Sequence, residues 1–132
     1  MKGQTTCHCG CGKDTQPSHK QIMAQIEKDM QQDLGADYQL VWACGARCEE
    51  HNGAVGGALN SAHTIGLGSD HELITSRERF SFIKACITRG IKRLEDRMLG
   101  HKYMHADTAE GPVPHPSIDL QEYPQNVFIV LP

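Results

Sequence analysis

The chain has 132 residues, a length typical of one compact domain, and a formal net charge of −3 at pH 7. Without a basic excess it has no charge pattern for neutralising nucleic-acid phosphates or an anionic membrane surface, so neither is expected as a partner. No apolar run approaches the about 20 residues that a membrane-spanning helix requires, and residues 1–6 lack the apolar stretch of a signal peptide. We therefore expect a single domain over residues 1–132 that is made in the cytoplasm.

Residues 1–17, rich in Cys and Gly, have no apolar period and predict an irregular N-terminal cap. A helix is expected next, with Ser18 as its N-cap and Gly35 as its stop. Its apolar residues recur at helical spacing and predict core packing: Ile22, Met23, Ile26, Met30 and Leu34. Residues 38–43 (YQLVWA) then predict a short buried strand.

Glycines are frequent over residues 44–69, which predict a long loop, and long ordered loops in small domains are usually functional. A second helix is expected from about Ser76 to Gly90, with Phe80, Ile83 and Ile87 on its buried face.

Strands are predicted over residues 102–106 and 127–131, and the proline-rich residues 108–123 predict an excursion over the surface. The whole pattern predicts an α+β domain in which two helices pack on a small antiparallel or mixed sheet.

Residues 61–70 (SAHTIGLGSD) contain the pattern S-x-H-x-x-G-x-x-x-D, which pairs an imidazole with a carboxylate. These are ligand types that suit Zn²⁺. On a helix, His63 and Asp70 would lie about 10.5 Å apart along the axis, and on a straight strand they would face opposite sides. They can reach one ion only if the chain folds back between them, a reversal that Gly66 and Gly68 permit.

A catalytic zinc keeps three protein ligands and an open position for water, so a third ligand is expected from a distant element. The best candidate is His105, within residues 103–107 (YMHAD). The alternative is that His63 and His105 are ordinary histidines, because a chain with eight histidines offers many accidental pairs.

Four segments, in this order, carry a resemblance to a known family: residues 44–52 (CGARCEEHN), 55–63 (VGGALNSAH), 103–107 and 123–128 (YPQNVF). They resemble the signature of zinc D-alanyl-D-alanine carboxypeptidases, which belong to a wider group with lysostaphin-type enzymes and the hedgehog signalling domain. The family pattern is similar to S-G-Y-R-x-x-x-x-N, a Gly-Gly step, S-x-H-x-x-G-x-A-x-D and a later H-x-D. The opening Cys-Gly-Cys-Gly is also similar to short phage-type members.

The resemblance implies site roles that the residues alone leave open. It implies Arg47 as the group that grips a substrate carboxylate, Ser61 as a substrate contact, and three metal ligands: His63, Asp70 and His105. A guanidinium can hold a carboxylate through two parallel hydrogen bonds, which is an independent reason for the role of Arg47.

Three positions depart from the family pattern. Ala46 stands where an aromatic residue is usual, so one wall of the substrate pocket is expected to be missing. Gly68 replaces an alanine without steric penalty. Lys102 stands where relatives carry a general base, three residues before the last histidine, and the candidates for that base are therefore Asp107 and His101. Asp107 shares a strand face with His105 and is expected to orient its ring, while His101 could accept a proton near neutral pH.

Cysteines crowd the N-terminus at Cys7, Cys9 and Cys11. With His8 or Cys48 they could form a second, structural zinc site. They could also remain reduced thiols or form one disulfide, and the absence of a C-x₂-C knuckle favours this second reading.

The sequence thus predicts a zinc-dependent peptidase, a monomer that hydrolyses a D-alanine-containing peptide bond of bacterial peptidoglycan as a carboxypeptidase or an endopeptidase. Without an export signal it would reach the cell wall after lysis, through a pore or on a particle, as a phage product does. The alternatives are a non-catalytic zinc-binding interaction module on the same scaffold and a structural component of a phage particle.

Overall fold

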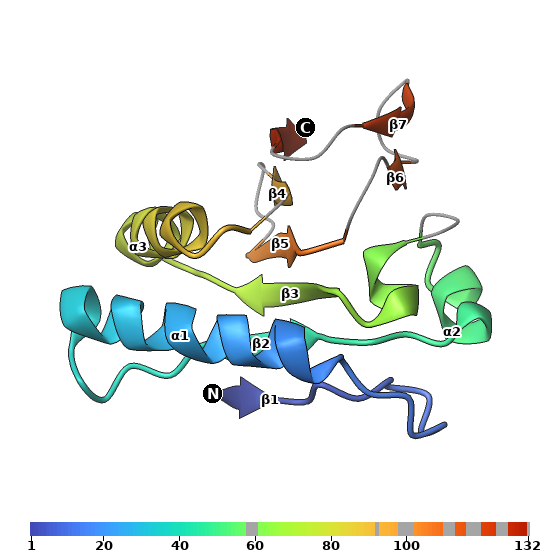
Figure 1. Cartoon of the computed structure of the whole chain (residues 1–132), viewed down its shortest axis with the longest axis horizontal. Coiled ribbons are helices and arrows are strands. Elements are labelled where there is room, and N and C mark those ends of the chain that lie inside the picture. The colour runs from blue at the N-terminus through green and yellow to red at the C-terminus, as the bar shows by residue number, and fades with distance from the viewer. Residues whose placement is uncertain are drawn as a thin grey trace.

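A mixed β-sheet organises the protein, described here from a computed structural model over residues 1–57, 61–91, 93–97, 102–109, 113–115, 120–123 and 127–131. Within these residues the sheet has six strands in the order β1-β2-β3-β5-β4-β8 (Figure 1). Their bounds are β1 (Lys2–Gly3), β2 (Val41–Cys44), β3 (Gly68–Glu72), β4 (Arg93–Arg97), β5 (Tyr103–Asp107) and β8 (Val127–Leu131). β1 pairs with β2, and β8 with β4, in parallel, and the other neighbours are antiparallel. β6 (Val113–His115) and β7 (Leu120–Tyr123) form a separate two-stranded sheet.

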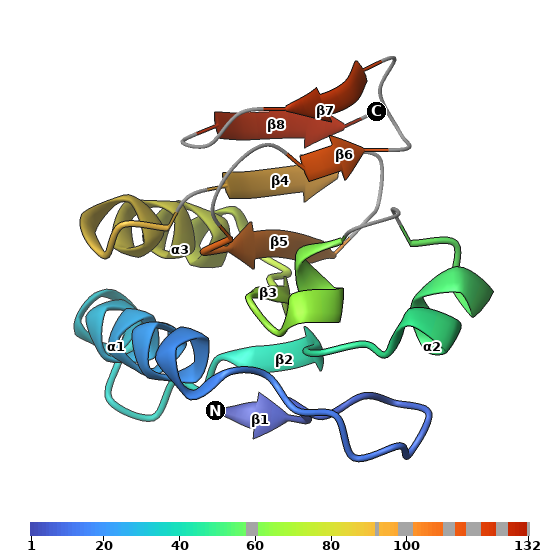
Figure 2. The same cartoon turned by 45° about the vertical axis from the view of Figure 1, so that its right-hand side comes forward.

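Two helices, α1 (Pro17–Leu34) and α3 (Ser76–Thr88), cover one face of the large sheet (Figure 2). Pro17 occupies the first turn of α1 after an extended Gln16, so the N-cap is Gln16 and not Ser18. Gly35, at a φ of 113°, ends α1 as expected. The core between helices and sheet is apolar: Met23, Ile26, Met30, Leu40, Trp42, Leu73, Phe82, Ala85, Cys86, Leu94, Met104 and Ala106.

The buried face of α3 differs from the one that the sequence predicts. Phe80 and Ile87 are about 70% exposed, at 71% and 70%, while Phe82 and Cys86 are fully buried. α3 carries two apolar stripes of helical period, offset by two residues, and periodicity alone cannot decide which stripe meets the sheet. Ile83 borders the core.

Residues 44–69 contain more regular structure than a loop. They form α2 (Glu49–Ala54), the 3₁₀ turn η1 (Ala62–Ile65) and the start of β3. Residues 108–123, expected as an excursion over the surface, include β6 and β7. The predicted α+β class with a mixed sheet is confirmed. In the described part of the chain no helix is long and apolar enough to span a bilayer.

The second face of the sheet carries a row of polar side chains. Asp70 on β3 is directly opposite His105 on β5, and His105 is opposite Glu95 on β4. Cys44, at the end of β2, is opposite Asp70. Residues directly opposite on neighbouring antiparallel strands project to the same face, about 4.5 to 5.5 Å apart at their Cβ atoms. The register therefore gathers Cys44, Asp70, His105 and Glu95 on the face away from α1 and α3.

Candidate metal centre

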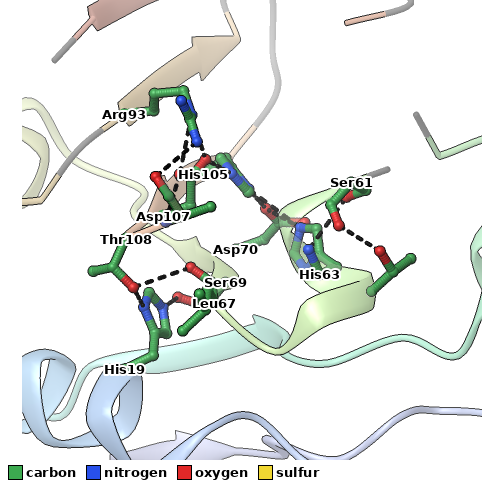
Figure 3. A network of polar contacts seen from close by, with 12 residues as sticks. His19, Ser61, His63, Leu67, Ser69, Asp70, Arg93, His105, Asp107 and Thr108 are labelled. Atoms are coloured by element: carbon green, nitrogen blue, oxygen red, sulfur yellow. Dashed lines mark hydrogen bonds and ion pairs between the residues drawn. The ribbon is translucent and has the colours of Figure 1, made fainter. Parts of the chain in front are cut away.

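Three donor atoms converge at the centre of this row (Figure 3). His105 Nδ1 lies 2.9 Å from Asp70 Oδ1 and 3.2 Å from His63 Nε2, and His63 Nε2 lies 3.2 Å from the same Asp70 oxygen. Asp70 and His105 come from paired strands, whereas His63 comes from η1. Two imidazole nitrogens and one carboxylate oxygen thus form a triangle with sides of 2.9 to 3.2 Å.

The other nitrogen of each ring is held by the protein. His63 Nδ1 lies 2.7 Å from the carbonyl oxygen of Gly45, which can only accept, so Nδ1 carries the proton. His105 Nε2 donates to Asp107 Oδ2 at 2.9 Å. Each ring therefore presents its remaining nitrogen toward Asp70. Hydrogen bonds of this kind orient histidine ligands at metal sites and fix their tautomers.

The chain reverses direction between His63 and Asp70, as the sequence predicts. Gly66 ends η1 in the left-handed conformation, with a φ of 74°, and β3 then runs back toward the site. Gly68 acts differently, because it lies within β3 and allows close packing. A Cβ at this position would lie 2.9 Å from the Ala62 Cβ and 3.0 Å from His105 Cε1. Neighbouring atoms occupy the space that an alanine methyl would need. The expectation that alanine and glycine are sterically equivalent at this position is therefore wrong.

Opposite charges dominate the electrostatics of the three groups. Burial alone would lower the pKa of His63, but the Asp70 carboxylate raises it to about 9. Burial likewise opposes a charged His105, yet hydrogen bonds to Asp107 and Asp70 raise its pKa well above the ordinary value. The pKa of Asp70 is held well below its usual range by His63 and His105, against the effect of burial. The three groups together favour a positive charge in contact with Asp70, which a bound metal cation would also supply.

A buried ion pair between Arg93 and Asp107 lies next to the Nε2 side of the His105 ring. Arg93 is fully buried, and its Nε lies 3.1 and 3.3 Å from the two carboxylate oxygens of Asp107. Arg93 also donates to the carbonyl of Ala109 at 2.9 Å. The pKa of Asp107 is lowered by His105 and Arg93, although burial acts in the other direction. Asp107 is therefore an ionised acceptor on the side of the His105 ring that faces away from Asp70.

Arg47 reaches the same site from the segment between β2 and α2. Its guanidinium donates to Asp70 Oδ2 at 3.3 Å, to Cys44 Sγ at 3.2 Å and to Asn52 Oδ1 at 3.2 Å. Gly57 makes room for the last contact, since a Cβ there would lie 2.0 Å from Asn52 Oδ1. The Gly-Gly step of the motif therefore lets Asn52 hold Arg47 beside the three donor atoms.

The other predicted site residues have different surroundings. Ser61 is buried and its Oγ accepts from the backbone N–H of His63 at 3.3 Å, so its described contacts shape η1, and a substrate contact remains a prediction. Ala46 is fully buried beneath the N-terminal segment, so the missing aromatic leaves no open wall there. Lys102 is exposed and pairs with Glu72 at 3.4 Å, away from the three donor atoms. His101 lies outside the described residues.

Two residues of the row were not singled out from the sequence. Cys44 Sγ lies within 4.8 Å of donor atoms of His63 and Asp70. It approaches His63 at Nδ1, at 3.9 Å, the nitrogen already bonded to Gly45, so His105 completes the donor set better than Cys44 does. Glu95 is largely buried beside His105, and its charge contributes to the raised pKa of that ring. Only the strand register, which a single sequence does not reveal, places Glu95 there.

The donor set fits zinc by its chemistry. Two imidazole nitrogens with one carboxylate oxygen are a recurrent ligand set of catalytic zinc sites, in which a fourth position remains open. The rings are already fixed by Gly45 and Asp107 in the orientation that ligation requires.

An α+β domain with a His-Asp-His donor set on one face of its sheet has the ligand types found in metal-dependent hydrolases. The sequence model of the Peptidase M15 family matches residues 2–107, and the chain belongs to this family. The match confirms the predicted resemblance and supports a zinc metallopeptidase of the general peptidoglycan-hydrolase type, with a peptide as substrate. A comparison with curated proteins found no match.

Proposed function

We propose that the protein hydrolyses a D-alanine-containing peptide bond of bacterial peptidoglycan, as a D-alanyl-D-alanine carboxypeptidase or as an endopeptidase. The observation that carries this proposal is the convergence of His63 Nε2, Asp70 Oδ1 and His105 Nδ1 within 3.2 Å of one another. These three atoms would hold the zinc. Bound there, zinc supplies Lewis acidity for hydrolysis near neutral pH.

Arg47 is proposed to bind the carboxylate of the substrate. A peptide that ends in D-alanine presents a terminal carboxylate, and a guanidinium can engage it through two parallel hydrogen bonds. Arg47 lies beside Asp70, 3.3 Å from its Oδ2, and its side chain is 15% exposed to solvent. This would place the bond to be cleaved next to the three donor atoms.

The proton transfers require a general base, and among the described residues Glu95 is the best placed. It projects from β4 on the same face as His105, directly opposite it. Asp107 also contacts His105, but its oxygens face Arg93 and the far side of the ring. In the proposed reaction Glu95 accepts a proton from the attacking water and delivers it to the nitrogen of the leaving amine as the C–N bond breaks. His101 and Asp107 remain the alternatives predicted from the sequence.

A mass-spectrometric assay on purified peptidoglycan tests this function. The zinc-loaded protein should release D-alanine from stem peptides if it is a carboxypeptidase, or divide cross-linked fragments if it is an endopeptidase. His105→Gln is the matched control, because glutamine retains a group that can hydrogen-bond Asp107 but removes the ring nitrogen that faces Asp70. Equal fragment patterns from the parent and His105→Gln would contradict hydrolysis at this site.

The rival function is a non-catalytic zinc module. It is favoured by Lys102, which stands at the position of the base in relatives and lies on the surface against Glu72. The same assay separates the two, because a binding module would retain peptidoglycan without changing its fragments. We further propose that the protein acts as a monomer on the cell wall after lysis, pore release or particle delivery.

A further inference from the structure

A second cluster of metal-ligating side chains lies outside the candidate centre. Cys7, Cys9 and Cys11 belong to the N-terminal loop, and Cys48 immediately precedes α2. Figures 1 and 2 both show this loop running beside α2. The four sulfur atoms lie within 4.8 Å of one another. Residues more than 35 positions apart in sequence therefore meet at one point.

The spacing of these sulfurs matches a tetrahedral metal site. The Sγ atoms are 3.4 Å apart for Cys7 and Cys9, 3.6 Å for Cys9 and Cys48, and 3.9 Å for Cys7 and Cys48. A zinc ion bound to four thiolates at about 2.3 Å separates neighbouring sulfurs by about 3.8 Å in a tetrahedron. All of these cysteines are free thiols in the structure.

The local backbone explains how a C-x-C-x-C segment can direct three sulfurs to one point. Gly10 and Gly12 have φ values of 84° and 85°, a conformation that favours glycine and turns the chain sharply. The turn is closed by hydrogen bonds from Gly10 N to Cys7 O at 3.2 Å and from Cys7 N to Lys13 O at 2.7 Å. A C-x₂-C knuckle is therefore not needed here.

Backbone donors also point at the sulfur atoms. Cys48 N–H donates to Cys7 Sγ at 3.4 Å, and His51 N–H donates to Cys48 Sγ at 3.3 Å. Hydrogen bonds to an ionised acceptor are stronger than those to a neutral one, so this arrangement stabilises thiolates over thiols. His8, the other candidate ligand in the loop, is exposed and has no donor atom in the cluster.

We propose a second, structural zinc site in this protein, with four cysteine ligands: Cys7, Cys9, Cys11 and Cys48. Four protein ligands leave no open position, which is the pattern of a structural rather than a catalytic zinc. This reverses the preference for reduced thiols or a disulfide that the sequence spacing suggested. The proposal does not depend on the peptidase activity.

The site would fix the N-terminal segment against the residues that carry Arg47. Ala46 N–H already donates to Thr5 O at 3.1 Å and to Thr15 Oγ1 at 3.0 Å, on either side of the cysteine loop. Cys48 is the residue after Arg47, so a metal bound to it would restrain Arg47 beside Asp70. A zinc ion at this site would therefore restrain the segment that carries Arg47.

Zinc stoichiometry of the reduced, full-length protein tests the proposal. The parent should contain two zinc ions per chain. Cys9→Ser and Cys11→Ser should each lose one, and so should His105→Gln, while His105→Gln combined with Cys11→Ser should lose both. Cys9 and Cys11 are exposed, so replacing them removes a ligand and no core packing. His8→Ser, a change in the same loop, should keep two zinc ions.

Cobalt substitution identifies which ligands hold the remaining metal. His105→Gln loaded with Co²⁺ should show the strong thiolate-to-metal charge-transfer absorption, and Cys11→Ser should show much less. Cys11→His restores a ligand of another type and should recover the second zinc ion. This recovery would exclude misfolding as the reason why Cys11→Ser loses zinc. One zinc ion in the reduced parent that Cys11→Ser retains, two in Cys11→Ser, or a disulfide among these cysteines in the zinc-loaded protein would each overturn the proposal, whereas one zinc ion that Cys11→Ser loses and His105→Gln keeps would support it. Two zinc ions without hydrolysis would instead contradict only the proposed function.

Discussion

Asp107→Asn is the substitution that best tests how the candidate centre is supported. Asp107 Oδ2 accepts from His105 Nε2 at 2.9 Å, and Oδ1 accepts from Arg93 Nε at 3.1 Å and from Ala109 N at 3.3 Å. Asparagine keeps one oxygen and replaces the other with an amide donor. In one orientation this amide opposes Arg93 and Ala109, and in the other it opposes the N–H of His105. Each orientation places the amide N–H₂ donor against at least one N–H donor.

Two effects of Asp107→Asn can be given a magnitude. Zinc affinity should fall about 10- to 100-fold, the usual result of removing a hydrogen-bond partner that orients a histidine ligand. The free energy of unfolding should fall by about 3 to 5 kcal/mol, because Arg93 is fully buried and the substitution removes the negative charge of Asp107 that faces it. Competition with a chromophoric chelator measures the affinity, and urea unfolding measures the stability.

Asp96→Asn provides the matched control on the same sheet. Asp96 pairs with Arg79 of α3 on the opposite face of β4, and both side chains are about one-fifth exposed. This variant should retain parental zinc affinity and lose less stability than Asp107→Asn, because its ion pair is partly exposed whereas that of Arg93 and Asp107 is buried. The reasoning on Asp107 would be refuted if Asp107→Asn bound zinc as tightly as the parent while turnover fell 100- to 10,000-fold. That result would make Asp107 the general base.

Three further substitutions test other parts of the site. Arg47→Lys should raise KM about ten- to a hundredfold at unchanged zinc content, since lysine keeps the charge but cannot pair with a carboxylate through two hydrogen bonds, and a parental kcat/KM would exclude the role of Arg47. Glu95→Gln should lower kcat by about 100- to 10,000-fold with zinc retained. Unchanged turnover would exclude Glu95 as the general base and leave His101 and Asp107 as the candidates. Gly68→Ala should destabilise the protein by about 1 to 3 kcal/mol in urea unfolding because its Cβ would crowd Ala62 and His105, and equal or higher stability would show that no such crowding exists.

The sequence predicted that His63 and Asp70 approach each other because that signal is local, whereas the full ligand set came from the family resemblance. The reversal at Gly66 requires glycine, and the spacing of His63 and Asp70 makes sense only with such a reversal. The alternation of residues 103–107 correctly places His105 and Asp107 on one face, where they form a hydrogen bond. The distance from Asp70 to His105 could not be predicted in this way, because it depends on the pairing of β3 with β5.

The features that the sequence did not reveal depend on tertiary contacts. β4 (RLEDR) has a charged composition and no strong strand propensity, and it forms because β5 and β8 pair with both of its edges. Arg93 and Glu95 are buried there for the same reason. Packing against the sheet likewise determines which apolar stripe of α3 is buried: Phe82 packs into the core and Phe80 is exposed.

His19 gives the protein a pH-dependent stability that the sequence alone does not indicate. Its ring is fully buried and bonded at Nε2 to Ser69 Oγ at 2.8 Å and at Nδ1 to Thr108 Oγ1 at 3.1 Å. Burial lowers the pKa of His19 to about 4, and the charges of His105 and His63 act in the same direction while that of Asp107 opposes them. Ser69 also contacts His71, whose pKa burial lowers to about 3.

The sign of the effect follows from which state binds the proton. Between about pH 6.5 and about pH 4 the unfolded chain protonates His19 and the folded chain does not, so acid destabilises the fold by roughly 1.4 kcal/mol per pH unit from this residue. Above about pH 6.5 His19 is neutral in both states and contributes no slope. His19→Gln keeps a hydrogen-bonding side chain but cannot titrate. Urea unfolding of the zinc-loaded parent and of the zinc-loaded variant gives two free energies of unfolding at each pH. The parent's value minus the variant's should fall steadily from about pH 6.5 to about pH 4. The contributions of zinc and of the other titrating groups cancel in this difference. A difference that stays constant with pH would mean that His19 is protonated in the folded protein, which would contradict its burial between Ser69 and Thr108.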